Sequence, residues 1–200
     1  NFTSTTGGLY MVTSRTTERL TLDGGIRYDY RQYRVAGLDY RNIAYHERMA
    51  YQNASATAGL NYQLSKFSSI TSTVSSTWRP PHVAELFSLG THQSAAAIEY
   101  GLLLDPVTNE VKSVSTVDFK NEKALKWVNT WHRMLRNAEI EITGYGSYIF
   151  NYIWLRPSGI TQNIRGAYPY FRYTQTDAFF TGVDGEFKFK ASDLTQLTAK

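Results

Sequence analysis

The sequence predicts an all-β protein whose strands form part of a transmembrane antiparallel β-barrel, and three observations support this. Several segments alternate apolar and polar residues over about 9–12 positions, which exceeds the usual soluble strand and suffices to cross a membrane. The composition is rich in strand-forming aromatic residues, with 15 Tyr, 10 Phe and 4 Trp. The expected connections alternate between short and long, as in barrels with short turns on one side of the membrane and long loops on the other.

The clearest strand pattern covers residues 19–31, after a first expected strand over residues 7–15 and a turn at Thr16-Thr17. One face of this second strand is apolar and the other is polar or charged. The apolar positions are Leu20, Leu22, Ile26, Tyr28 and Tyr30, and the polar ones are Arg19, Thr21, Asp23, Arg27, Asp29 and Arg31. A soluble sheet with one buried face shows the same alternation, but the length of the strand favours a membrane barrel.

Later segments extend this pattern to about eight strands. Further strands are expected over residues 51–64, 67–78, 123–132, 138–154 and 173–190, with a last one beginning after residue 193. Three long loops are expected at one end of these strands, over residues 35–47, 78–122 and 155–172. Their common placement predicts that they are extracellular.

Composition excludes several other classes of protein. No run approaches the roughly 18 apolar residues of a transmembrane helix. The absence of Cys excludes a disulfide framework, a thiolate zinc site and a cysteine nucleophile. The net charge of +4 comes from basic residues scattered along the strands, so nucleic-acid binding is not expected. The chain begins at Asn1 without a signal-peptide pattern, and we expect it to be an internal piece of a longer protein.

Two regions resemble the barrel of TonB-dependent outer-membrane receptors. The first is the central stretch, with the runs Arg79-Pro80-Pro81, Glu85-Leu86-Phe87, Gly90-Thr91-His92 and Lys120-Asn121-Glu122-Lys123. The second is the stretch with Phe150-Asn151-Tyr152-Ile153, Gly166-Ala167-Tyr168-Pro169 and Tyr173-Thr174-Gln175-Thr176-Asp177-Ala178. The segment Gly101-Leu102-Leu103-Leu104-Asp105-Pro106 departs from the family's pattern, so ligand identity cannot be transferred across the central loop.

The resemblance implies that residues 1–200 are part of a 22-stranded barrel domain, with the plug domain and the TonB box outside this chain. It implies a receptor in the bacterial outer membrane that takes up a scarce nutrient by TonB-dependent active transport. The expected partners are outer-membrane lipid, the protein's own N-terminal plug, TonB acting through the plug, and the extracellular nutrient. Ferric siderophore, haem, a metal ion such as zinc, cobalamin and oligosaccharide all stay open as the cargo, and no resident cofactor is expected.

Two other functions compete with this interpretation. A passive porin or adhesin barrel would share the strand pattern but have no plug. A soluble extracellular β-sandwich that binds a ligand would share the alternation. An enzyme is not expected: Glu139 and Glu141 share a strand face, but no nucleophile or orienting group accompanies them. With Arg27, Arg31, Glu186 and Lys188, they are expected to face the lumen and hold a plug.

The central loop contains the candidate ligand-binding residues Arg79, His82, Glu85 and His92. Imidazole and carboxylate groups suit zinc, iron or haem. Their spacing matches no metal signature, and solvated loop histidines are the simpler interpretation. The guanidinium of Arg79 suits an anionic ligand, and the alternative is an ion pair with a carboxylate of the lumen or plug.

Overall fold

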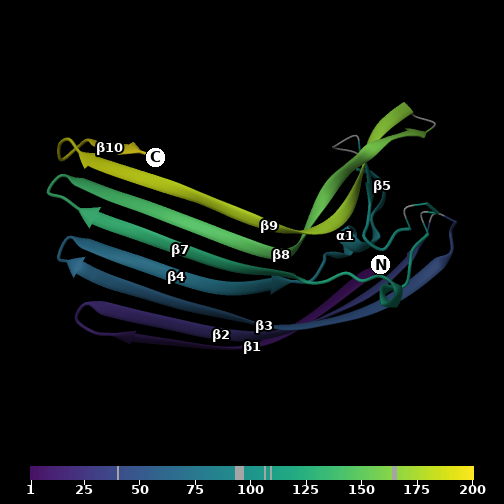
Figure 1. The fold of residues 1–200 in the computed structure, drawn as a ribbon, viewed down its shortest axis with the longest axis horizontal. Coiled ribbons are helices and arrows are strands. Elements are labelled where there is room, and N and C mark those ends of the chain that lie inside the picture. The colour runs from purple at the N-terminus through teal and green to yellow at the C-terminus, as the bar shows by residue number, and fades with distance from the viewer. Residues whose placement is uncertain (40, 93–96, 106, 109, 164–165) are drawn as a thin grey trace.

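The structure is a computed structural model that describes residues 1–39, 41–92, 97–105, 107–108, 110–163 and 166–200. It is built almost entirely of strands (Figure 1). The elements are β1 (Phe2–Thr16), β2 (Leu20–Leu38), β3 (Ala44–Ser65), β4 (Ser68–Arg79), α1 (Val83–Phe87), β5 (Leu89–His92), β6 (Ala97–Tyr100), η1 (Val114–Thr116), β7 (Glu122–Met134), β8 (Ala138–Asn163), β9 (Gly166–Lys190) and β10 (Gln196–Ala199).

All ten strands belong to one curved sheet. β1, β2, β3, β4, β7, β8 and β9 pair as an antiparallel meander, and β10 continues it on β9. β6 pairs with β9 in parallel, and β5 pairs with β6. The meander confirms the expected series of eight strands, and the short β5–β6 hairpin is an addition. Because the described strands form a single open layer, the alternative of two packed sheets is wrong.

The pairing register gathers apolar side chains on the convex face of the sheet. Leu22 pairs with Leu60 and Ile26 with Ala56, while Val183 on the same face of β9 is 75% exposed. The apolar run of β2 covers ten residue steps, which at ~3.4 Å per residue and a tilt of ~40° spans about 25 Å. This is the height of the apolar band of an outer-membrane barrel, so the face suits lipid.

The concave face carries the polar half of each strand. Arg27 and Asp29 form an ion pair there with 2.8 Å between Nη2 and Oδ1. Further contacts join neighbouring strands: Asn61 to Thr71 at 2.8 Å, Thr130 to Thr143 at 2.9 Å, and Lys188 to Glu139 at 3.6 Å. Lys188 also pairs with Glu186 of its own strand at 3.3 Å. The register thereby places the residues expected in the lumen on one face.

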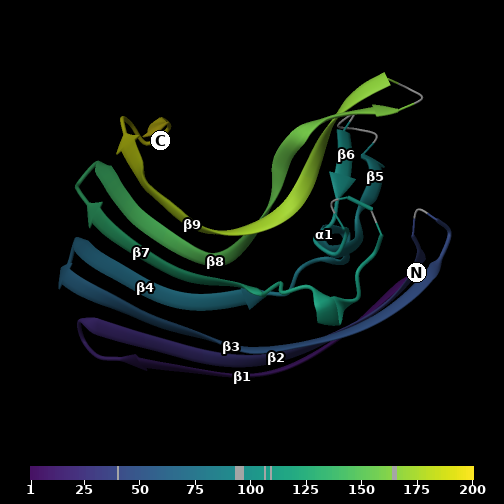
Figure 2. The ribbon, with the colours of Figure 1, turned by 45° about the vertical axis from the view of Figure 1, so that its right-hand side comes forward.

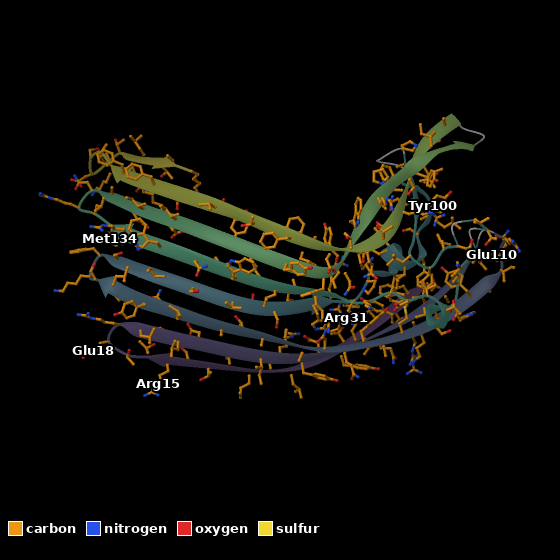
Figure 3. All side chains as sticks on the ribbon, viewed as in Figure 1. Arg15, Glu18, Arg31, Tyr100, Glu110 and Met134 are labelled. Atoms are coloured by element: carbon orange, nitrogen blue, oxygen red, sulfur yellow. The ribbon has the colours of Figure 1, made fainter. Side chains whose placement is uncertain are left out.

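The connections at the two ends of the sheet differ in size (Figure 1). At one end, residues 17–19, 66–67, 135–137 and 191–195 make short turns. Arg15, Glu18 and Met134 lie at this end, whereas Tyr100 and Glu110 lie at the other (Figure 3). The central connection, residues 80–121, is at the second end, which we call the loop end.

Two of the three expected long loops are mostly strand, which corrects the sequence interpretation. β2 and β3 extend to Leu38 and from Ala44, and β8 and β9 extend to Asn163 and from Gly166. The ladder continues there with pairs such as Val35 with Glu47. The apolar pattern changes there: in β2 the buried positions are Tyr33 and Val35, on the opposite parity from Leu22 and Ile26. In the described residues, no helix has the length and apolar character needed to cross a bilayer.

A charge on the convex face should destabilise the barrel, and one on the concave face should not. Val183 lies near the middle of the apolar band, opposite Gly144. We expect Val183→Lys to lower the free energy of unfolding of the full-length protein in bilayers by ~2–4 kcal/mol. The control is Thr143→Lys, which lies at a similar height beside Asp184 on the polar face. Equal losses in urea titrations of the two variants would contradict the assignment of the faces.

Candidate functional site

The central connection folds back onto the concave face of the sheet at the loop end. Figure 2 shows α1, β5 and β6 inside the curve of the sheet, above β2 and β3. This connection is longer than ordinary loops and contains its own small elements, a feature typical of functional loops. It therefore lies where the opening of a closed barrel would be.

A hydrophobic cluster attaches this connection to the sheet. Leu86 of α1 and Leu103 are fully buried, at 0% exposure. Each such side chain contributes about 1.5–3 kcal/mol through burial. We call the whole cluster the loop core, and it consists of Tyr33, Val35, Met49, Tyr51, Leu86, Phe87 and Leu103. The first four come from β2 and β3, so the inner faces of these strands become apolar where the loop covers them.

Aromatic contacts and backbone hydrogen bonds order the loop core. The rings of Tyr45 and Phe87 stack with centroids 5.3 Å apart and an interplanar angle of 11°. The amide of Leu103 donates to the carbonyl of Leu86 at 2.9 Å, and the amide of Gly101 donates to Ser88 at 2.8 Å. The segment after β6 thus satisfies carbonyl groups that the short helix α1 leaves free at its end.

An arginine between two carboxylates closes the base of the central connection. Arg79 ends β4 and Glu122 begins β7, and they are the last pair of that ladder. The guanidinium of Arg79 holds Glu85 through two bonds, Nη1 to Oε2 at 2.7 Å and Nη2 to Oε1 at 2.9 Å. Its Nε contacts Oε2 of Glu122. We call these three residues the arginine clamp.

The clamp reaches two further elements through its carboxylates. Glu122 is 7% exposed, and its Oε1 accepts a hydrogen bond from the amide of Ile153 on β8 at 2.6 Å. Glu85 also accepts from the amide of His82 at 2.6 Å, and Nδ1 of His82 accepts from Ala84 at 3.2 Å. This reciprocal arrangement is a capping box at the start of α1. One guanidinium therefore links β4, α1, β7 and β8.

The structure brings three of the four predicted ligand-binding residues together. Arg79 and Glu85 are ion-paired with each other, and His82 caps the helix that contains Glu85. The fourth, His92, ends β5 opposite Ala97, and its side chain lies outside the described part of the chain. The hydrogen bonds of Arg79, His82 and Glu85 assign them a positioning role within the loop. Direct contact of any of the four with a ligand stays a prediction.

Polar contacts fasten the β5–β6 hairpin to β9. The phenol of Tyr173 donates to Glu99 Oε2 at 3.3 Å. Burial, together with the nearby carboxylate of Glu99, raises the pKa of Tyr173. The guanidinium of Arg172 lies 4.6 Å from the ring centroid of Tyr100, and the Tyr100 and Tyr170 rings meet edge to face. The hairpin consequently presents aromatic and charged groups at the loop end.

A tight polar turn completes the connection. The carboxylate of Asp105 accepts hydrogen bonds from the amides of Thr108 and Val107 and pairs with Lys112 at 2.9 Å. These contacts, the Thr108 amide foremost, lower the pKa of Asp105. Because the pKa falls on folding, this turn is stabilised above the ordinary Asp range and loses that support as the pH drops below about 4.

Several residues of the site were not identified as functional candidates from the sequence. Leu103 and Glu122 belong to runs without clear periodicity, although Glu122 lies in one of the runs that resemble the receptor family. Tyr33 and Met49 lie just outside the loop expected over residues 35–47, in positions assigned to no strand. For Tyr33, the available signal was that the apolar residues Tyr33 and Val35 alternate with the charged Arg34 between them. Among the described residues, no group of three His, Asp or Glu side chains converges as a metal site.

Neutralising Glu122 should loosen the central connection. Glu122→Gln removes the charge opposite Arg79, whose side chain is 41% exposed. We therefore expect a cost below that of a fully buried pair, about 1–3 kcal/mol. Amide exchange across residues 80–121 of the full-length protein should speed up by about tenfold or more. The matched control is Glu110→Gln, whose exposed pair with Arg41 should contribute less than about 1 kcal/mol. Unchanged exchange in Glu122→Gln would refute the role of the clamp.

Gly101 should tolerate no side chain. A Cβ at this position would collide with the backbone carbonyl of Leu86 and the amide of Phe87. We expect Gly101→Ala to displace α1 from the loop core at a cost of ~1–3 kcal/mol and to expose residues 83–105 to proteolysis. Gly144→Ala is the control, since nothing lies within 4 Å of its Cβ position. Equal protease resistance of both variants would contradict the packing described here.

Comparison with known proteins identifies the family of the chain and shows which solved structures share its fold. The chain matches the family of TonB dependent receptor-like β-barrels over residues 1–199. No curated protein sequence matches it. The copper transporter OprC superposes with a TM-score of 0.69 at 15% identity, over 95% of this chain and 27% of that chain.

Two further solved structures share the fold. The Serratia marcescens hemophore receptor HasR, in complex with its hemophore HasA and heme, gives a TM-score of 0.64 at 16% identity, over 94% of this chain and 32% of that chain. The ferric yersiniabactin uptake receptor FyuA from Yersinia pestis gives 0.61 at 14% identity, over 96% and 25%. This chain therefore spans about a quarter to a third of their length. Because the family match covers nearly the whole chain, the protein belongs to the TonB-dependent receptor-like β-barrel family, whose members are outer-membrane proteins.

Proposed function

We propose that this barrel segment belongs to an outer-membrane receptor that takes up a scarce nutrient by TonB-dependent active transport. The observation that supports this best is the central connection, which the loop core and the arginine clamp hold over the concave face at the loop end. A loop fixed inside the mouth of a barrel narrows the opening and presents side chains to an incoming ligand. Family membership supports the same conclusion.

The cargo that we propose is a metal ion or a metal complex such as a ferric siderophore or haem. The loop end offers Tyr100 in contact with both Tyr170 and Arg172, together with the exposed His82. Aromatic rings and guanidinium groups suit a flat or anionic chelate. The similarity to proteins named for copper, heme and ferric yersiniabactin supports this class of cargo.

The proposed partners on the concave face are a plug domain and, through it, TonB. The charged residues Arg27, Asp29, Glu139, Glu186 and Lys188 face this side and are mostly paired with one another. Such groups can exchange partners with a polar domain inside the barrel without burying an unpaired charge. They would hold a plug by hydrogen bonds and ion pairs that an applied pull can break.

A passive pore is the second candidate, because an inward-folded loop would also narrow a pore. The two functions differ in energy dependence. A passive pore would conduct small solutes down their gradients with no inner-membrane partner, whereas the proposed receptor would accumulate its cargo only when TonB is present.

Uptake by cells tests the proposal. The full-length gene, expressed in a strain lacking its own receptors, should support uptake of at least one of radiolabelled copper, ferric siderophore or haem. Deletion of tonB in the same strain should abolish that uptake. Gly101→Ala should reduce uptake by about tenfold or more through loss of loop order, while Gly144→Ala should not. Uptake that is independent of TonB would overturn active transport and favour the passive pore.

A further inference from the structure

Two arginines lie directly opposite each other on the convex face, above the apolar band. Arg34 of β2 pairs with Arg48 of β3, and both side chains are exposed. Their positions share the parity of Ile26, Tyr28 and Tyr30, which face lipid lower on β2. Like charges directly opposite in an antiparallel ladder destabilise it. An anion bound between the two guanidinium groups would remove this repulsion.

The protein itself supplies no such anion in the described residues. No carboxylate pairs with Arg34 or Arg48 there, and the outward-facing neighbours are Thr3, Gln32, Ala36, His46 and Ala50. The amide of Gln32, oriented with its oxygen toward Arg48, accepts from Nη2 at 2.9 Å and Nε at 3.2 Å. That oxygen is neutral, so it orients one guanidinium and leaves the charge of both uncompensated.

A hollow accompanies the pair on the same face. Its volume is about 330 Å³. Its polar lining residues are Asn1, Thr3, Arg34, His46, Arg48 and one carboxylate, that of Glu47, which pairs with neither arginine; Val35 and Ala36 complete the lining. Thr3, His46 and the two arginines provide hydroxyl, imidazole and guanidinium donors around one space. Guanidinium groups bind phosphate through paired N–H bonds, which are stronger than bonds to neutral acceptors.

The height of the pair above the membrane fits a lipid head group. Tyr28 and Tyr30 mark the upper edge of the apolar band, and the Tyr28 hydroxyl donates to Gln52 at 2.8 Å. Arg34 lies four residues beyond Tyr30, which corresponds to about 10 Å along the membrane normal. The head-group layer is ~5–8 Å deep on each side. Long arginine side chains can bend back by several ångströms to reach it.

We propose that Arg34 and Arg48 form a binding site for the phosphate groups of an anionic lipid in the outer leaflet. Aromatic side chains at the band edge contact the upper acyl region, and the two guanidinium groups bind the phosphate between them. Bound phosphate removes the repulsion across the β2–β3 ladder and joins the receptor to its surrounding lipid. The site lies on the opposite face from the central connection, so it is separate from the path of the nutrient.

Lipid binding by the full-length protein tests this proposal. Wild type and Arg34→Gln/Arg48→Gln would be purified in neutral detergent, and native mass spectrometry would count bound lipid A and chemically dephosphorylated lipid A. We expect the double variant to bind lipid A at least about tenfold more weakly, and the dephosphorylated lipid to bind weakly to both proteins. Arg15→Gln is the matched control, because Arg15 lies on the same face of β1 at the short-turn end.

The unfolding temperature is a second readout, and it distinguishes loss of lipid binding from loss of folding. Without lipid, the double variant should unfold at a temperature equal to or above that of wild type, because the like-charge pair is gone. With lipid A, wild type should gain stability and the double variant should not. Equal lipid A affinity of the two proteins would overturn the proposal. If the double variant instead lost a co-purified acidic protein while binding lipid A as wild type does, the two arginines would be a site for a protein partner. That result would also overturn the lipid proposal. Uptake of the nutrient can fail or succeed independently of either result.

Discussion

The backbone ladder that runs from β1 through β9 separates two solvents, and the other features of the molecule depend on this separation. Within the apolar band the inner strands β2, β3, β4, β7 and β8 pair on both sides, so their backbone donors and acceptors are satisfied within the sheet. A membrane tolerates only such a surface. Alternate side chains then meet lipid on the convex face and water or protein on the concave face, and a shift of one residue would exchange the two.

The same ladder explains how an irregular connection acquires a fixed shape. Arg79 and Glu122 become neighbours because they close the β4–β7 ladder, and the clamp then draws Glu85 and α1 onto the sheet. Beyond the membrane the concave face changes from polar to apolar, with Tyr33 and Met49 available to Leu86 and Leu103. The sheet thus positions the loop by charge at its base and by apolar contact at its tip.

The sequence predicted the membrane-spanning part of the fold well and the parts outside the membrane poorly. The facing of Leu22, Ile26 and Arg27 follows from alternation, because lipid and water impose it at every second residue. The extension of β2 changes that pattern, since its buried side chains, Tyr33 and Val35, lie on the concave face. Arg79 and Glu85 were identified as functional candidates from a motif. Their mutual pairing spans only six residues, but the role of Glu122 depends on a contact between distant segments, which local pattern does not encode.

The parallel pairing of β6 with β9 covers part of the border of a projecting hairpin. The β8–β9 hairpin rises above the rest of the sheet (Figure 2), and the free border of such a hairpin is a template on which another chain can add. β6 occupies that border of β9 from Tyr170 to Arg172. Pro157 in β8 and Pro169 in β9 each remove a backbone donor. The central connection therefore satisfies backbone groups of a strand border besides covering the concave face, which lowers the tendency of that part of β9 to pair with another chain.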